Sequence, residues 1–260
     1  MNIFIADETN NEPSEQVKFF IYGGIIVDST NVRNIVSDVR NLRNELRISD
    51  NEKLKFNIRS CPTNLSRTEH TEAKSRILDI AATNNVRVII NCVLHAIARN
   101  NSKNELVEMT SATAFRRFND YCSETHTPGF VMADQWPVDN GFGFLESCIN
   151  GGISYRGGTT ARLPWIHAFS QVSDNSTPLM SVADIVLGSF RWCINNQDKT
   201  DVNTALMPRI AGLMWYSGAT NNRSILNRGL NFSPREVLVE KYKDQYTELY
   251  EHILHFANSL

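Results

Sequence analysis

The sequence lacks the short motifs that would on their own assign a cofactor or a catalytic class. It contains neither of the glycine-rich phosphate-binding patterns GxGxxG and GxxxxGK[ST], and neither HExxH nor GxSxG occurs. Each of these patterns places side chains or backbone N–H groups against a phosphate, a zinc ion or a reacting carbonyl. Motifs therefore give no support to a Rossmann or P-loop nucleotide-binding protein, a zinc metallopeptidase or an α/β-hydrolase.

Cysteine is scarce and shows no metal-binding spacing. The five cysteines are odd in number and widely separated, and no CxxC pair occurs. This pattern excludes a disulfide framework or a zinc knuckle as the basis of the fold. We expect most of them to be buried thiols in a reducing cytoplasm.

Long apolar runs and strong net charge are also absent. The longest stretch without Asp, Glu, Lys or Arg, residues 210–222, has 13 residues, whereas a membrane span needs about 20. The first residues, MNIFIADETNNE, contain no basic region, so we expect no secretory signal. The net charge of -2 argues against coating of nucleic acid by bulk charge but leaves a local basic groove open. We expect a cytoplasmic protein without a membrane segment.

The chain has enough apolar residues for one sizeable core, since 42% of its residues are hydrophobic. Periodicity predicts both strands and helices. Strands are expected over 2–7, 17–27, 86–94 and 129–136, and a hairpin or loop over 151–166. Helices are expected over 31–47, near 69–83, over 105–122 and from 177 to about 194. Ser233-Pro234-Arg235-Glu236 has the pattern of a capping box that opens a last helix at Pro234. The pattern predicts an α/β fold with a mixed sheet.

The first strand brings two acids to its end. Side chains alternate between the faces of a strand, so Asp7 shares a face with Ile3 and Ile5, and Glu8 points to the opposite face. Glu8 can join a site with Asp7 only if the strand ends or bulges there.

Two further acids lie in apolar surroundings. Asp134 ends the run FVMA, and Asp184 lies inside the apolar helix around VADIV. A buried carboxylate is costly unless it is paired or bound to a cation. Singly, each acid can cap a turn or pair with an arginine. Together, Asp7, Asp134 and Asp184 favour a shared Mg²⁺ or Mn²⁺, because these ions prefer hard oxygen ligands.

The sequence resembles the bacterial DUF3800 family. The family's opening strand ending in Asp-Glu is matched by residues 4–8, and its second strand ending in Gly-Gly by residues 17–24. Its closing helix, L-Q-x-A-D-x-x-x-G, is matched by residues 179–188, where Ser181 replaces the Gln and Thr9-Asn10 replaces the Ser-Gly that follows the opening acids. Leu54-Lys55-Phe56 and Asp134-Gln135 resemble intermediate motifs, so that the resemblance spans about residues 1–195.

The resemblance implies an RNase H-like domain over 1–232 and a C-terminal helix, 233–260, packed on the same domain. RNase H-like enzymes place one acid on the first strand, one on the fourth strand and one on a late helix. The order of Asp7, Asp134 and Asp184 along this chain is consistent with that arrangement. It implies a metal-dependent nuclease in which Asp7 bridges two ions and Asp134 and Asp184 each hold one. Glu8 joins the catalytic set or supports it, while Lys55, Ser181 and Arg156 would contact substrate.

Two other functions remain open. The site could have decayed, as Ser181 suggests, leaving a binding or regulatory subunit of a defence-associated bacterial system, with the C-terminal helix mediating self-association or partner binding. The chain could instead hydrolyse nucleotides rather than polymers. Nucleic-acid contact would require a basic surface. The candidates, each of which could equally be an ordinary charged face, are Arg33, Arg40, Arg43, Arg47, Arg116, Arg117, Arg156 and Arg162.

Overall fold

The structure is a computed structural model that describes residues 1–134, 141–154, 158–173, 176–217 and 224–257. Its strands are β1 (Asn2–Thr9), β2 (Phe19–Asp28), β3 (Arg87–Leu94), β4 (Gly129–Asp134), β5 (Ile153–Ser154), β6 (Thr160–Ala161), β7 (Ile166–Val172) and β8 (Leu230–Ser233). Its helices are α1 (Val32–Glu45), the short 3₁₀ turn η1 (Ile58–Ser60), α2 (Arg67–Thr83), α3 (His95–Ala98), α4 (Lys103–Glu124), α5 (Gly141–Gly151), α6 (Pro178–Asn195), α7 (Thr200–Leu213) and α8 (Glu240–Ala257).

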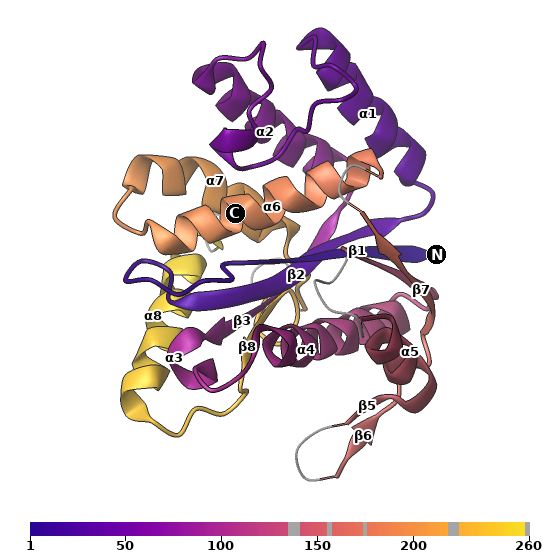
Figure 1. The fold of residues 1–260 in the computed structure, drawn as a ribbon, viewed down its shortest axis with the longest axis vertical. Coiled ribbons are helices and arrows are strands. Elements are labelled where there is room, and N and C mark those ends of the chain that lie inside the picture. The colour runs from indigo at the N-terminus through magenta and orange to yellow at the C-terminus, as the bar shows by residue number, and fades with distance from the viewer. Residues whose placement is uncertain (135–140, 155–157, 174–175, 218–223, 258–260) are drawn as a thin grey trace.

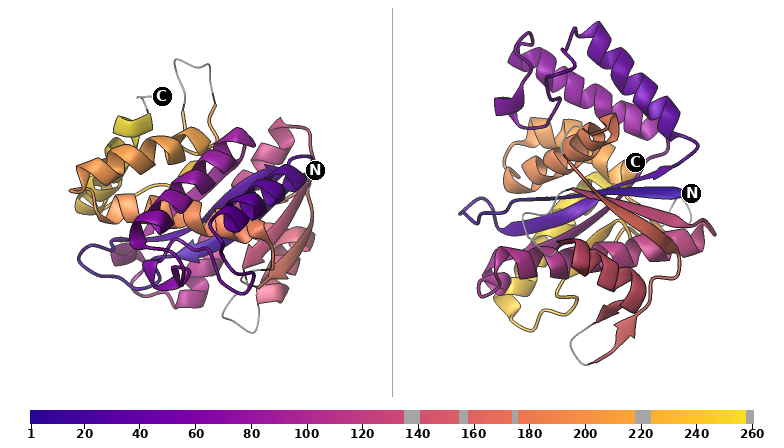
Figure 2. Two further views of the ribbon diagram at one scale, coloured as in Figure 1. Left: turned by 90° about the horizontal axis from the view of Figure 1, so that it is seen from above. Right: turned by 45° about the vertical axis from the view of Figure 1, so that its right-hand side comes forward.

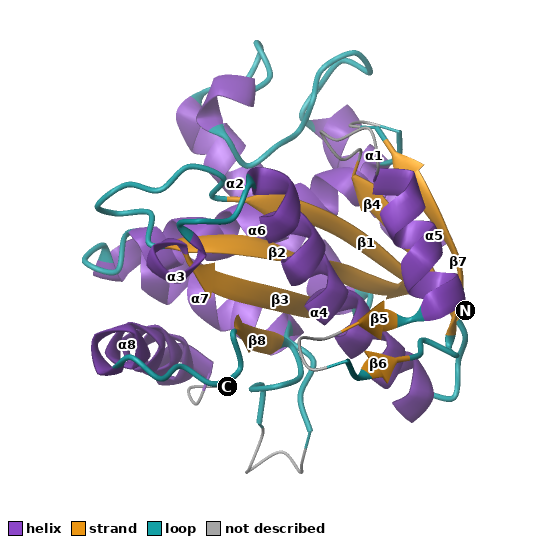
Figure 3. Cartoon of the chain, turned by 60° about the horizontal axis from the view of Figure 1, so that its bottom comes forward, coloured by secondary structure: helices purple, strands orange, loops and turns teal. Residues whose placement is uncertain are grey.

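Within the described residues, six strands form one mixed sheet in the order β7-β4-β1-β2-β3-β8 (Figure 3). β2 runs antiparallel to both of its neighbours, β1 and β3, whereas the pairs β1–β4, β4–β7 and β3–β8 are parallel. β5 and β6 form a separate two-stranded ladder. The prediction of an α/β fold with a mixed sheet is confirmed.

Helices cover both faces of this sheet. In Figure 1, where the sheet is seen close to edge-on, α1, α2, α6 and α7 lie on one side and α4 and α5 on the other. The right-hand view of Figure 2 shows α6 and α7 against the sheet, with α1 and α2 beyond them. The alternation of β1 divides the core accordingly: Ile5 belongs to the cluster beneath α6, and Phe4 and Ala6 belong to the cluster against α4. Burial on both faces explains the nearly continuous apolar sequences of β2 and β3.

Two adjacent glycines let the central strands approach one another. A Cβ at Gly24 would lie 1.9 Å from the carbonyl oxygen of Ile5, and a Cβ at Gly23 would lie 2.5 Å from that of Ile89. Neither position can hold a larger residue without moving backbone.

Most of the predicted elements are present. The predicted strands 2–7 and 17–27 form the antiparallel pair β1–β2, and the predicted hairpin or loop over 151–166 includes the short β5–β6 ladder. The four predicted helices are α1, α2, α4 and α6. Capping boxes at Ser66 and Ser102 begin α2 and α4, and the Thr177 hydroxyl accepts from the backbone N–H of Leu179 at the start of α6. All five cysteines are free thiols, and four of them are buried.

The start predicted for the last helix is wrong. Ser233 ends β8 instead of capping a helix, and α8 begins at Glu240. The Ser233 hydroxyl donates to the side chain of Asn91 over 3.1 Å, and its carbonyl accepts from the Tyr246 hydroxyl over 2.7 Å. These contacts hold the serine in the sheet, so it cannot cap a helix.

None of the helices in the described ranges is both long and apolar enough to cross a membrane.

Candidate functional site

Asp7 lies near the carboxyl end of β1, on the face of the sheet that α6 covers. β1 stays regular through this position, since Asp7 pairs with Gly23 and Glu8 with Tyr22. The backbone N–H of Glu8 donates to the Asp7 carboxylate over 2.7 Å. No cationic side chain in the described part of the chain pairs with Asp7.

The carboxyl group of Asp7 is strained electrostatically. Its pKa is raised well above the usual aspartate range, mainly by burial and then by the charges of Glu8, Asp134 and Asp184. The Glu8 N–H opposes this shift because it stabilises the charged form. Four acids are therefore close enough to repel one another, although they are separated by as many as 177 positions in the sequence.

Asp134 reaches the site because β4 lies beside β1. Their parallel register pairs Ala6 with Ala133 and ends at that pair, so Asp134 follows directly beside Asp7. Met132 packs against the cluster beneath α6, and alternation places Asp134 on that same face.

Asp184 comes from α6, and a loop residue fixes its orientation. One carboxylate oxygen of Asp184 accepts from the backbone N–H of Phe56 over 2.6 Å. The next turn of the helix carries Gly188, where a Cβ would lie 2.3 Å from the Cβ of Phe56. Asp184 and Gly188 thus act together: the glycine admits the Phe56 ring, and the packed ring holds its N–H against the acid.

Phe56 is held from two further directions. The Lys74 ammonium lies 4.5 Å from the ring centre, and the Arg191 guanidinium lies 5.7 Å from it. The ring nitrogen Nε2 of His70 lies 2.9 Å from the carbonyl oxygen of Lys55. Since a carbonyl can only accept, this nitrogen donates. The Lys55–Phe56 segment is therefore fixed beside α6, and the predicted substrate residue Lys55 lies next to Asp184 in space.

Glu8 faces away from the other acids and is paired with a lysine. Its carboxylate lies 3.8 Å from the ammonium of Lys103, the first residue of α4. Burial raises the pKa of Glu8 and Asp134 adds to this, whereas Lys103 opposes it. The structure thus brings Glu8 near the other acids but directs it to the α4 face, as the alternation of β1 requires.

Sequence reasoning missed Lys103 and Arg191. The Arg191 guanidinium donates to the Thr9 hydroxyl over 3.0 Å, which ties α6 to the end of β1. Asp184, Gly188 and Arg191 are spaced by four and three residues and so share one helix face; this spacing could have identified Arg191. No local signal marks Lys103, whose partner is 95 positions away.

Of the two remaining predicted substrate residues, Ser181 and Arg156, only Ser181 lies within the described residues. Ser181 is half-buried one turn before Asp184 on α6, on the same face of the helix. Arg156, with Gln135 and Trp136, lies outside the described residues. Of the predicted basic surfaces, Arg43 donates to the backbone carbonyls of Ser49 and Glu52. The side chains of Arg116 and Arg117 both pair with Asp120.

The donor chemistry of the site fits a hard divalent cation. Asp7, Asp134 and Asp184 present carboxylate oxygens, and burial together with the charges of the neighbouring acids raises the pKa of Asp7. Among the described residues, however, no three His, Cys, Asp or Glu side chains are arranged as a ready metal-binding group. A cation bound at Asp7 would have to draw the neighbouring carboxylates closer together.

A comparison with protein-family models, curated proteins and solved structures finds no match to this chain. The resemblance to the DUF3800 family therefore stays a prediction.

Proposed function

We propose that this protein is a metal-dependent nuclease that hydrolyses phosphodiester bonds in DNA or RNA, on an RNase H-like fold of the DUF3800 type. The observation that carries the proposal is the convergence of acids from β1, β4 and α6 on a half-buried Asp7 that has no cationic partner among the described residues. Such an arrangement is unfavourable for folding alone, and a bound cation would make it favourable.

The order of the acids supports the RNase H-like assignment. The first acid lies on β1, the second on the fourth strand, β4, and the third on a late helix, α6. This is the order that the resemblance implies for a two-metal nuclease.

The residues suggest a division of roles. Asp7 would hold both ions, and Asp134 and Asp184 would hold one each. Bound there, Mg²⁺ or Mn²⁺ supplies a Lewis acid for the phosphodiester and an activated water. The Phe56 N–H keeps the Asp184 carboxylate oriented, and Lys55 and Ser181 would contact a substrate phosphate. Glu8, paired with Lys103, supports the site from the other face of β1.

The alternative is a binding or regulatory subunit with a weakened site. Two observations favour it: Ser181 stands where the family has a longer Gln, and no ready metal-binding group is formed by the described residues. Hydrolysis of free nucleotides is the third function to be tested.

One comparison separates these functions. The purified protein is incubated with labelled single-stranded and double-stranded DNA and RNA and with nucleoside triphosphates, in Mn²⁺, Mg²⁺ or chelator. We expect metal-dependent cleavage of a polymer, reduced about a hundredfold or more by Asp7→Asn or Asp184→Asn, since even outer partners of metal ligands cost 10–100-fold.

Asp28→Asn is the matched control. Asp28 lies at the opposite end of the β1–β2 pair, where it is opposite Asn2, so its loss should leave cleavage unchanged. If the wild type and both site variants behave alike on every polymer, the nuclease proposal fails. Binding without cleavage would support the regulatory alternative.

A further inference from the structure

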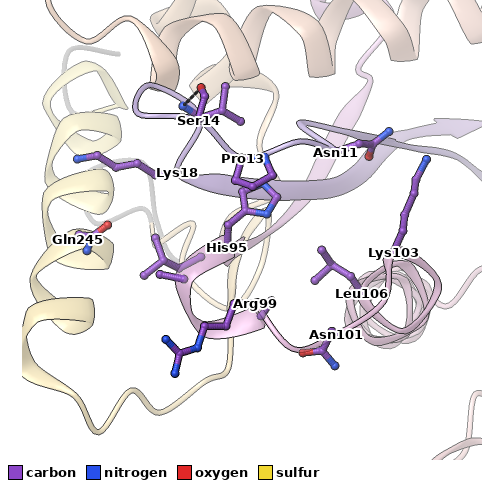
Figure 4. Close-up of a pocket in the computed structure, with 14 residues that line it drawn as sticks. Asn11, Pro13, Ser14, Lys18, His95, Arg99, Asn101, Lys103, Leu106 and Gln245 are labelled. Atoms are coloured by element: carbon purple, nitrogen blue, oxygen red, sulfur yellow. Dashed lines mark hydrogen bonds between the residues drawn. The ribbon is translucent and has the colours of Figure 1, made fainter.

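A groove of about 570 Å³ lies beside the candidate site, at the end of the sheet where β1 ends and β3 meets α3. Its walls come from the β1–β2 connection, the segment from β3 through α3 to α4, and α8. Figure 4 shows Lys18, Arg99 and Lys103 arranged around it, with Pro13 and His95 between them and Gln245 of α8 at one side. None of the comparisons assigns a role to this groove.

All the described Lys, Arg, Asp and Glu residues that line this groove are basic, and we call it the basic groove. Three of its described lining residues are Lys18, Arg99 and Lys103, and none of those described residues is acidic. Lys18 and Arg99 are exposed, and neither has an acidic partner among the described residues. Burial lowers the pKa of His95, so at neutral pH the positive charge comes from these three side chains.

The groove also has an apolar floor. Val17, Leu94, Ala98 and Leu106 line it together with Pro13. The backbone around it is fixed: His95 Nε2 donates to the carbonyl of Asn10 over 2.9 Å, and the Asn10 side chain exchanges hydrogen bonds with that of Asn195. A fixed apolar floor beside Lys18 and Arg99, which have no acidic partner among the described residues, suits a ligand that has apolar parts and anionic groups.

Lys103 joins the groove to the candidate site. Its ammonium lines the groove and lies 3.8 Å from Glu8, which adjoins Asp7 on β1. A strand lying in the groove would therefore reach the end of β1 on the α4 face, opposite the face that carries Asp7, Asp134 and Asp184. The volume of the groove suits one or two nucleotides, which favours a single strand over a duplex as its occupant.

We propose that the basic groove binds a single-stranded segment of nucleic acid, with its phosphates on Lys18 and Arg99 and its bases on the apolar floor. The inference rests on the proposed function only for the cleavage of a bound strand at the acids. Binding in the groove needs neither metal nor cleavage.

The test measures binding in chelator by the fluorescence anisotropy of labelled oligothymidylate and oligouridylate, with a duplex of equal length as a third probe. The whole chain is used as wild type, as Lys18→Ala with Arg99→Ala, and as Arg33→Ala with Arg40→Ala. The last pair removes the same charge from exposed positions on α1.

Loss of two phosphate contacts should lower the slope of log affinity against log salt by about 1.4 and weaken binding about 25-fold near 0.1 M salt. The α1 variant should bind like the wild type, and the duplex should bind more weakly than either single strand. The DNA and RNA probes distinguish the two sources of the phosphodiester chain. A thermal unfolding midpoint equal to that of the wild type shows that the groove variant is folded.

The inference is overturned if the groove variant keeps the wild-type salt slope, if only the α1 variant loses affinity, or if the duplex binds best. These outcomes are independent of cleavage. Cleavage by the wild type, together with unchanged binding by the Lys18→Ala, Arg99→Ala variant, would leave the nuclease proposal standing and overturn the groove inference. Groove-dependent binding by a protein that cleaves nothing would do the opposite.

Discussion

At the scale of single residues, the ionised form of Asp7 works against folding. Its carboxyl group is buried beside Glu8, Asp134 and Asp184, and these surroundings raise its pKa. Between the ordinary aspartate pKa and this raised value, the folded protein keeps a proton that the unfolded chain has released. The contribution of Asp7 to stability is therefore present at low pH and is lost as pH rises through the raised pKa.

Asp7→Asn should consequently stabilise the metal-free protein at neutral pH, because an amide is uncharged and similar in size. The expected gain in the free energy of unfolding is on the order of 1 kcal/mol at pH 7 and close to zero near pH 4. Urea unfolding in chelator at the two pH values measures it.

Asp28→Asn is again the control, because the pKa of Asp28 is shifted in the opposite direction to that of Asp7. The Thr30 hydroxyl and backbone N–H hold the pKa of Asp28 below its usual range, so its replacement should stabilise nothing at pH 7. A wild type that is more stable than Asp7→Asn at neutral pH would contradict the electrostatic account of the site.

Some of these residue contacts could be predicted from the sequence and some could not. Alternation along β1 separates Asp7 from Glu8, and apolar neighbours single out Asp184. The partners Phe56 and Lys103 are joined to these acids only by folding, since a backbone N–H or a surface lysine carries no local mark of what it will contact.

At the scale of elements, the Lys55–Phe56 segment packs against α6. Gly188 leaves room for the Phe56 ring, and the backbone N–H of Phe56 donates to the Asp184 carboxylate. A helical glycine normally costs about 1 kcal/mol relative to alanine. Here the close contact with Phe56 accounts for its presence in an otherwise bulky, buried helix.

Gly188→Ala should therefore destabilise the protein, by about 1–3 kcal/mol, because overpacking outweighs the gain in helix propensity. It should also reduce any metal-dependent activity, since displacement of Phe56 removes the hydrogen bond that orients Asp184. Denaturant unfolding and the cleavage assay measure the two effects.

Gly143→Ala in α5 provides the matched comparison, because no atom lies within 4 Å of the Cβ that it would add. It should gain up to about 1 kcal/mol from helix propensity and leave activity unchanged. If the two substitutions shift stability in the same direction, the packing role of Gly188 is wrong.

The elements at the C-terminal end show where local signals mislead. The segment from Ser233 to Glu236 has a sound capping pattern, yet Ser233 lies in β8, where Asn91 and Tyr246 bind it. Tyr246 also accepts from the backbone N–H of Leu94 over 2.8 Å, so α8 is fastened to both β3 and β8. Contacts across more than a hundred residues thus override a four-residue motif.

At the scale of the whole molecule, the site lies where the two layers of helices meet the same end of the sheet. α6 brings Asp184 and Arg191 to one face of β1, and α4 brings Lys103 to the other. The basic groove begins at Lys103, and α8 closes one of its sides through Gln245. The C-terminal helix is therefore both fastened to the sheet edge and part of the proposed binding surface.

This architecture predicts that a divalent cation stabilises the entire fold. An ion at 100 times its dissociation constant adds about 2.7 kcal/mol, and each kcal/mol is worth about 2–4 °C at this chain length. The unfolding midpoint should rise by roughly 5–10 °C in Mn²⁺ for the wild type and hardly at all for Asp7→Asn, even though the variant starts from the more stable apo state. Because protons compete with the ion for Asp7, the rise should shrink as pH falls. Calorimetry with and without Mn²⁺ at several pH values tests this, and an equal rise in both proteins would place the cation elsewhere.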